Sequence, residues 1–174
     1  PIAVMILYSF NSSKSRSHFA GFSLRWYKEL INNDAIMSAL AVTLIVAVVS
    51  AVCATLIGTL AAIGIQSMKR KSQSAIMNFT YVPIVSPEIV MGVSLMLLFA
   101  LFGMKSGMVT LVLAHITFNI PYVILSVMPK LRQMDKHLFD AAMDLGCTPA
   151  MAFVKVMLPE IMPGIVTGFL MALT

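Results

Sequence analysis

The feature that most constrains this chain is a run from Ala35 to Met68 that contains no charged residue. About 20 apolar residues suffice for an α-helix to cross the hydrocarbon core of a bilayer. Two further runs are similar: Ser72–Met104 is interrupted only by Glu88, and Ser106–Pro129 has no Asp, Glu, Lys or Arg. Only 11% of the residues are charged, whereas soluble domains average about 25%. The sequence therefore predicts an integral membrane protein.

These apolar runs favour an all-α fold. Only helices and closed β-barrels satisfy their own backbone hydrogen bonds in lipid, and the runs lack the alternating hydrophobic pattern of barrel strands. We therefore predict a polytopic membrane helix bundle with about five spans. The expected spans are residues 1–10 (partial), 37–66, 76–102, 108–128 and 161–174 (partial).

Both ends of the chain lie inside apolar stretches. Pro1–Tyr8 carries no charge, and Thr174 ends an apolar stretch that begins near Ile161. Each stretch is shorter than a complete span of about 20 residues. We therefore expect a piece of a longer protein, with at least one further span after Thr174.

The segment before the first complete span has interfacial character. It carries apolar and aromatic side chains at helical spacing, and Ser23 is available as an N-cap. Trp and Tyr favour the membrane–water interface, so a short anchoring helix on the outer surface is expected. Residues 1–34 are thus predicted to form a partial span and an outer-surface segment, and residues 35–174 a helical core with a cytoplasmic loop at 129–160. The side chains at helical spacing are Phe22, Trp26, Tyr27, Leu30 and Ile31.

The basic residues between the spans predict the orientation. The side with more positive charge receives Lys69, Arg70, Lys71, Lys130, Arg132, Lys136 and Lys155. The other side receives Lys14, Arg16, Arg25, Lys28 and Lys105. By the positive-inside rule the first set is cytoplasmic, most clearly through the short turn at residues 69–71.

Several classes of function lack their sequence signals. The net charge of +5 comes from residues between apolar runs, and the basic, aromatic-interleaved patch of a nucleic-acid-binding protein is missing. Cys53 and Cys147 form no CxxC or Cys/His cluster, so neither a disulfide nor a metal site is indicated. An intramembrane protease would need motifs such as HExxH or GxSxG, which do not occur. A secondary transporter would need coupling-ion carboxylates or an inverted repeat, and neither is visible.

The cytoplasmic loop is predicted to contain two short helices joined at a glycine. Asp135 is placed to N-cap the first helix, which runs to Leu145, and Gly146 is placed to end it at the C′ position. Thr148-Pro149 forms an N-cap and N1 pair for a second helix over residues 150–157. Leu158-Pro159 is expected to close that helix, because a residue before proline resists the α conformation.

The loop resembles the EAA loop of ABC-importer permease subunits. The matching residues are Asp140-Ala141-Ala142-Met143-Asp144-Leu145-Gly146, followed by Leu158-Pro159 and Pro163-Gly164. The family pattern is an acidic-Ala-Ala triplet, a Gly four residues after the second Ala, and a later Leu-Pro pair. Asp140 replaces the usual Glu, Cys147 replaces the usual Ala, and Pro149 is atypical. The helix–Gly–helix design survives these departures.

Other segments resemble the spermidine/putrescine importer permeases, and the C-type subunit in particular. They are Tyr8–Ser13, Gly21–Tyr27, Asn32–Asp34, Ser86–Met91, and His115–Phe118 with Pro121. The resemblance implies a type I importer core of six helices in the plasma or inner membrane. It also implies a second permease subunit, two cytoplasmic ATPase subunits and an extracytoplasmic solute-binding protein as partners. A permease of the same fold for another solute, such as iron, sulfate or phosphonate, is the alternative.

The resemblance assigns roles to specific residues. Contact with the ATPase is expected of Asp140, Ala141, Ala142, Asp144, Gly146, Leu158 and Pro159. The chain has no GxxxxGK[ST] phosphate loop, so it is expected to be a transport subunit rather than an enzyme. ATP and Mg²⁺ would be bound by partner subunits, and no catalytic, cofactor-binding or metal-binding residue is assigned in this chain.

Glu88 is the one acidic residue inside a predicted span. A carboxylate at membrane depth is costly and usually faces a bundle interior or an aqueous path. One interpretation is an anionic point on the path of a cationic solute. The other is a structural cap beside a helix break at Pro83–Pro87. Both roles can hold together.

Overall fold

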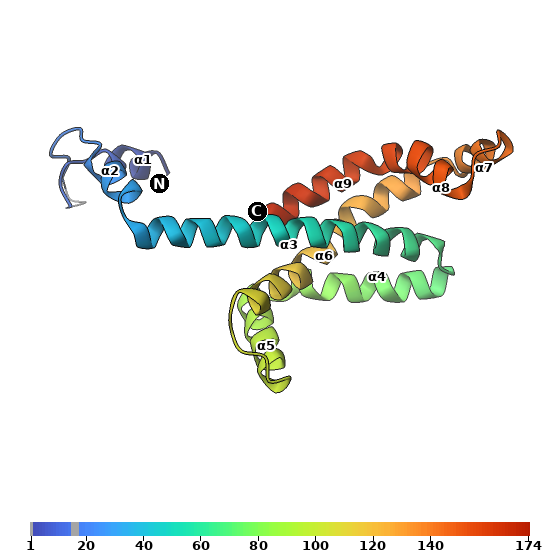
Figure 1. Ribbon diagram of the computed structural model, residues 1–174, viewed down its shortest axis with the longest axis horizontal. Coiled ribbons are helices and arrows are strands. Elements are labelled where there is room, and N and C mark those ends of the chain that lie inside the picture. The colour runs from blue at the N-terminus through green and yellow to red at the C-terminus, as the bar shows by residue number, and fades with distance from the viewer. Residues whose placement is uncertain (1, 15–17) are drawn as a thin grey trace. The chain divides into compact units, whose positions relative to one another are not determined.

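The computed structural model describes residues 2–14 and 18–174. Pro1 and residues 15–17, including Arg16, lie outside the described residues, as does the side chain of Lys136. Within the described ranges, regular secondary structure is helical apart from one isolated bridge between Asn11 and Phe22, so the all-α prediction is confirmed. The chain forms two compact units, Pro1–Ile45 and Val46–Thr174. The helices are α1 (Ile2–Ser9), α2 (Arg25–Ile31), α3 (Asp34–Ser67), α4 (Arg70–Val85), α5 (Glu88–Leu101), α6 (Met108–Gln133), α7 (Lys136–Asp144), α8 (Pro149–Ala152), the π-helix η1 (Phe153–Met157) and α9 (Leu158–Leu173) (Figure 1).

The first unit is organised around the side chain of Asn11, which is only 1% exposed. Its Nδ2 donates to the carbonyl of His18 at 2.9 Å, and its Oδ1 accepts from the amide of Ala20 at 2.8 Å. The indole Nε1 of Trp26 donates to the Asn11 carbonyl at 2.7 Å. These bonds hold the two ends of the loop between α1 and α2 together and join the loop to the start of α2.

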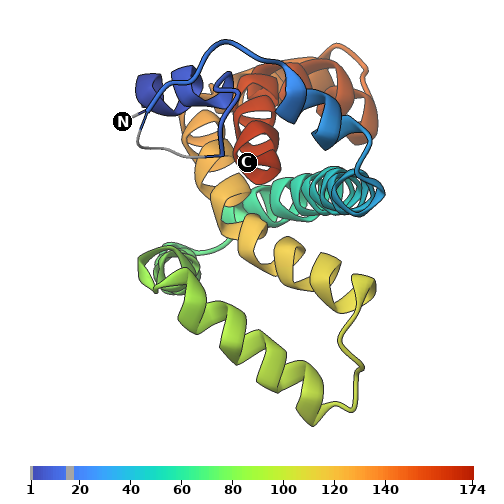
Figure 2. The same ribbon diagram turned by 90° about the vertical axis from the view of Figure 1, so that its left-hand side faces the viewer.

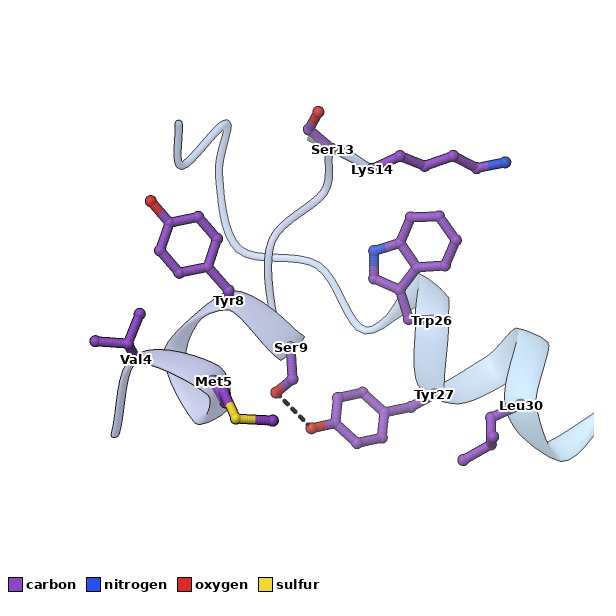
Figure 3. A pocket seen from close by; sticks show the side chains of 9 residues that line it. All are labelled: Val4, Met5, Tyr8, Ser9, Ser13, Lys14, Trp26, Tyr27 and Leu30. Atoms are coloured by element: carbon purple, nitrogen blue, oxygen red, sulfur yellow. Dashed lines mark hydrogen bonds between the residues drawn. The ribbon is translucent and has the colours of Figure 1, made fainter. Parts of the chain in front are cut away.

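Aromatic side chains complete this unit. The rings of Phe10 and Phe22 stack with centroids 5.1 Å apart, and Ser9 Oγ lies 2.7 Å from the hydroxyl of Tyr27 (Figure 3). The short helix predicted in this segment is present as α2, and its place on the outer surface stays a prediction. Its N-cap is Leu24 rather than Ser23, although Ser23 Oγ accepts from the amide of Arg25 at 3.1 Å.

A cavity of about 730 Å³ between α1 and α2 is lined by Val4, Met5, Tyr8, Ser9, Ser13, Lys14, Trp26, Tyr27 and Leu30.

The second unit is built on an antiparallel pair, α6 and α9, which lie side by side in Figures 1 and 2. Small residues allow the two backbones to approach closely. A Cβ on Gly164 would lie 2.8 Å from the carbonyl oxygen of Ser126, and a Cβ on Gly168 would lie 3.1 Å from the Cα of Val123. The Asn119 side chain donates to the Ala172 carbonyl at 2.8 Å and fixes the register.

Helix α3 joins this pair through a stripe of small residues. Ala51, Ala54, Gly58 and Ala62 are buried. A Cβ on Gly58 would lie 2.7 Å from the Cβ of Val123. The backbone of α3 at Gly58 therefore packs directly against the Val123 side chain of α6. The side chain of Val123 therefore lies between glycines of two different helices.

The stretch predicted as one span over residues 76–102 is divided. Helices α4 and α5 meet at an angle of 106°. Ser86 precedes Pro87 and adopts an extended conformation with ψ 141°, which ends α4 because the α region is disfavoured before proline. The predicted break at Pro83–Pro87 is confirmed, and the single continuous span is corrected to a bent pair.

The stretch around Leu158-Pro159 shows the opposite behaviour. We predicted that this pair would end a helix, and that prediction is wrong. Leu158 remains in the α region with φ −61° and ψ −46°, and α8, η1 and α9 form one continuous helical segment, Pro149–Leu173. The π turn donates from the Leu158 amide to the Phe153 carbonyl. Its wider ring leaves room for the pyrrolidine of Pro159 in the first turn of α9.

Within residues 2–14 and 18–174, three or four segments qualify as complete membrane spans, compared with about five predicted spans of which two were partial. Three helical segments, Asp34–Ser67, Met108–Gln133 and Pro149–Leu173, are long and apolar enough to cross a membrane. The bent pair α4–α5 raises the number to four if it is counted as one span. Helix α1 has 8 residues and corresponds to the partial span predicted over residues 1–10. The last predicted span also begins earlier than residue 161, because it continues the loop helix.

We expect Gly58→Ala to destabilise the bundle, because its Cβ would be forced against Val123. Overpacking of a buried contact costs about 1–3 kcal/mol of unfolding free energy. The matched control is Gly64→Ala in the same helix, where a Cβ meets nothing within 4 Å. Helix propensity makes that control neutral or stabilising by up to about 1 kcal/mol. Unfolding of the full-length protein in detergent, followed by circular dichroism, measures both, and equal midpoints would contradict the close approach.

Candidate functional site

The glycine corner of the loop over residues 129–160 is present as predicted from the sequence. Asp135 Oδ1 accepts from the amide of His137 at 2.9 Å and caps the start of α7. At the other end, the amide of Gly146 donates to the Met143 carbonyl at 2.9 Å, and that of Cys147 donates to the Ala142 carbonyl at 3.0 Å. This pair of bonds is a Schellman motif, which requires a left-handed residue at its corner. Gly146 supplies it with φ +87°.

Helix α7 has an inner and an outer face. Ala142 is 8% exposed, and α7 packs against α8 and η1. Ala141, one residue earlier in the sequence, is exposed on the outer face. The two alanines of the motif therefore differ: Ala142 holds α7 against its own loop, and Ala141 is available to a partner.

The outer face of α7 carries an apolar ridge that the sequence analysis did not single out. Leu138, Ala141 and Leu145 follow one another at spacings of three and four residues, so they share one side of the helix. Leu138 is 47% exposed and Leu145 is 86% exposed. Asp140 and Asp144 are exposed beside this ridge. The spacing of three and four residues between these apolar side chains is the sequence signal that could have identified the ridge. The sequence analysis treated Leu145 only as the last residue of the helix before Gly146.

The second half of the loop connects α7 to α9. Thr148 Oγ1 accepts from the amide of Met151 at 3.3 Å, and Pro149 takes the first position of α8, both as predicted. Leu158 is partly buried and Pro159 exposed, and both lie within the continuous segment Pro149–Leu173. Helix α7, which carries the predicted coupling residues Asp140, Ala141, Ala142 and Asp144, packs against α8 and η1, and these two elements continue into α9.

Glu88 lies apart from this loop. It is the first residue of α5, directly after the 106° bend, and its side chain is exposed. Figures 1 and 2 both show the α4–α5 bend away from α7. A carboxylate in the first turn of a helix interacts favourably with the helix dipole, which supports the structural interpretation. Exposure at a break between two apolar helices is equally required by the pathway interpretation, so both stand.

The fold and the loop together define a class of protein, an α-helical membrane component with a helix–glycine–helix corner. Residues 54–174 match the family described as "Binding-protein-dependent transport system inner membrane component". The chain belongs to this family.

Individual relatives carry more specific names. The putrescine transport system permease protein PotI of Escherichia coli K12 is 39% identical over 181 residues, covering 100% of this chain and 64% of that protein. The spermidine/putrescine transport system permease protein PotC of the same strain is 37% identical, covering 100% of this chain and 66% of that protein. PotC of Haemophilus influenzae is 34% identical, with 100% and 68% covered. The chain therefore spans about two thirds of the length of these relatives.

We expect Gly146→Val to loosen α7, because valine pays about 1–2 kcal/mol for a left-handed conformation. A Cβ at this position meets nothing within 4 Å, so the effect is one of backbone strain rather than of clash. Gly146→Asn is the control, since asparagine tolerates this region better than other residues. Amide hydrogen exchange over residues 136–147 should accelerate roughly five- to thirtyfold in the valine variant and much less in the asparagine variant. Equal protection in both would contradict the left-handed corner.

Proposed function

We propose that this chain is the permease subunit of an ATP-driven ABC importer that carries polyamines into the cell. The observation that carries the proposal is the glycine corner of α7, with an exposed ridge on one side and a continuous helix into the membrane on the other. The names of PotI and PotC, which are putrescine and spermidine/putrescine permeases, support the polyamine assignment. The family's dependence on a binding protein supports an importer.

The ridge of α7 is the proposed contact with the ATPase. Leu138, Ala141 and Leu145 present apolar surface to the cytoplasm, where it is stable only if covered. Asp140 and Asp144 would lie at the polar rim of the contact and meet basic side chains. Gly146 holds the ridge at a fixed angle to α8. Leu158 and Pro159 have an indirect role, because they carry the movement of the loop into α9.

The packing of α9 against α6 would transmit a displacement of the loop to the rest of the bundle. Because Gly164 and Gly168 press α9 against the backbone of α6, a displacement of α7 and α8 cannot be absorbed by loose side chains at this interface. Helix α6 in turn contacts α4 and α5. ATP-driven closure of the ATPase subunits would therefore reach the bend at Ser86–Glu88 through packed helices.

The remaining parts of the proposed complex lie outside this chain. They are a second permease subunit, two ATPase subunits that bind ATP and Mg²⁺, and a solute-binding protein on the outer side. This chain would contribute one half of the membrane path and hydrolyse no ATP itself. The orientation predicted from the basic residues places α7 on the side of the ATPase.

Glu88 is the proposed anionic point on the solute path. A polyamine carries several ammonium groups at neutral pH, and each needs an acceptor when it loses water. A carboxylate supplies a charge-assisted hydrogen bond to such a group. The same carboxylate would repel sulfate or phosphonate, so Glu88 favours the polyamine over these alternative solutes.

We expect Leu145→Ser to uncouple ATP hydrolysis from uptake while the membrane bundle stays folded. Removing a buried leucine from an interface costs about 1.5–3 kcal/mol, or roughly ten- to a hundredfold in affinity for the ATPase. Val154→Ser is the matched control, because Val154 is 56% exposed in the same loop but lies on η1 rather than on α7. The assays are co-purification of the ATPase and stimulated ATP hydrolysis in proteoliposomes. Normal stimulation in the Leu145 variant would refute the docking ridge.

We expect Glu88→Gln to impair uptake of putrescine or spermidine roughly five- to a hundredfold, from the loss of about 1–3 kcal/mol of charged hydrogen bonding. The variant keeps the shape of the side chain and removes its charge. Assembly of the complex and docking of the binding protein should be retained. The control is Glu88→Asp, which keeps the charge and should transport better than the glutamine variant. Normal uptake by Glu88→Gln, combined with failed assembly of Glu88→Ala, would make Glu88 a structural cap only.

A further inference from the structure

A basic cleft separates α4 from α6 at the end of the bundle that carries the turn Lys69–Lys71. Its volume is about 510 Å³, and it is lined by Arg70, Gln73, Ser74, Met77, Tyr81 and Arg132. The two arginines come from different helices, one from the first turn of α4 and the other from the last turn of α6. Both are exposed, so their guanidinium groups are available to a ligand.

The cleft continues into a second cavity of about 290 Å³. The two cavities share Met77, Tyr81 and Arg132, and the second adds Leu125 and Met128 on α6. Met77 and Met128 are buried. The groove is therefore amphipathic along its length, with arginines at one end and apolar side chains toward the middle of the helices.

The charged side chains that line the groove are Arg70 and Arg132. None of the described residues that line the two cavities is acidic. The neighbouring Lys69 and Lys130 add positive charge in the sequence segments that hold the arginines. An arginine pair without a carboxylate partner suits a phosphate, because the guanidinium fork can donate two parallel hydrogen bonds to phosphate oxygens.

We propose that this groove binds an anionic phospholipid of the cytoplasmic leaflet. The phosphate lies between Arg70 and Arg132, and one acyl chain follows Tyr81, Leu125 and Met128 toward the bilayer centre. The orientation predicted from the basic residues places the arginines at the inner headgroup region, where anionic lipids attract basic side chains. A soluble phosphate would use only the polar end of the groove, whereas a lipid matches both ends.

The lipid would join α4, which precedes the bend, to α6, which follows α5 in the chain. Helix α4 contacts α6, and α4 ends at Val85, next to the bend. A headgroup held by both arginines would act as a clamp between the cytoplasmic ends of these helices. This inference does not depend on which solute the protein carries.

The test uses the complete importer complex, purified in detergent and analysed by native mass spectrometry with phosphatidylglycerol as the probe. We expect Arg70→Gln and Arg132→Gln each to weaken retention of phosphatidylglycerol about fivefold, and the double variant roughly 25-fold. Lys71→Gln is the matched control, since Lys71 lies in the same turn but lines neither cavity. It should retain the lipid like the unaltered protein. Phosphatidylcholine, which carries a phosphate but no net charge, should be retained weakly by all five proteins.

Two further measurements separate the outcomes. Excess inorganic phosphate should leave phosphatidylglycerol bound, because it cannot replace the acyl-chain contacts, and displacement by phosphate would overturn the lipid assignment. A photoreactive phosphatidylglycerol in vesicles should label residues 70–81 and 125–133 of the unaltered complex, which keeps the test valid if the arginine variants do not assemble. Labelling confined to other segments, or equal retention in the double variant, would refute the site.

Discussion

Two helices approach α6 at the same residue, and the rest of the second unit depends on this double contact. Val123 lies between Gly58 of α3 and Gly168 of α9, with no room for a Cβ at the first position. In a membrane the hydrophobic effect does not drive helices together, so close backbone packing must supply the attraction. The glycines make that packing geometrically available. The positions of the loop and of the bent helix pair then follow from where α6 and α9 are held.

The loop is informative because its two sides have different physical requirements. Its inner side, with Ala142 and Ala152, is buried and holds α7 against α8 and η1. Its outer side leaves Leu138 and Leu145 in contact with water. A loop that needed only to connect two spans would have no reason to order a capped helix with an exposed apolar ridge. The Schellman corner and the continuous helix into α9 make the loop stiff, as the proposed coupling to an ATPase subunit requires.

The pairs Ser86-Pro87 and Leu158-Pro159 show when a local conformational preference decides the structure and when packing overrides it. The rule that a residue before proline leaves the α region predicts a helix end at both Ser86-Pro87 and Leu158-Pro159. The first pair obeys it, and the second does not. None of the 14 residues of α5 is buried, so little packing opposes the change of direction after Pro87. In α9, by contrast, Ile161, Gly164 and Gly168 are packed against α6. A π turn keeps the helix continuous and so preserves this packing, whereas a break would change the direction of α9.

The sequence alone determined the membrane class, the all-α fold, the caps of the loop and its glycine corner. These properties are local: an uncharged run must be helical in lipid, and Asp135, Thr148 and Gly146 each satisfy backbone groups within a few residues of themselves. The sequence also identified the family through its loop motif. Only the tertiary structure decided which proline breaks a helix, which of Ala141 and Ala142 is available to a partner, and that Arg70 and Arg132 share one cleft. Those outcomes depend on contacts between α4, α6, α7 and α9, which are far apart along the chain, and the packing free energy of such contacts outweighs local conformational preference.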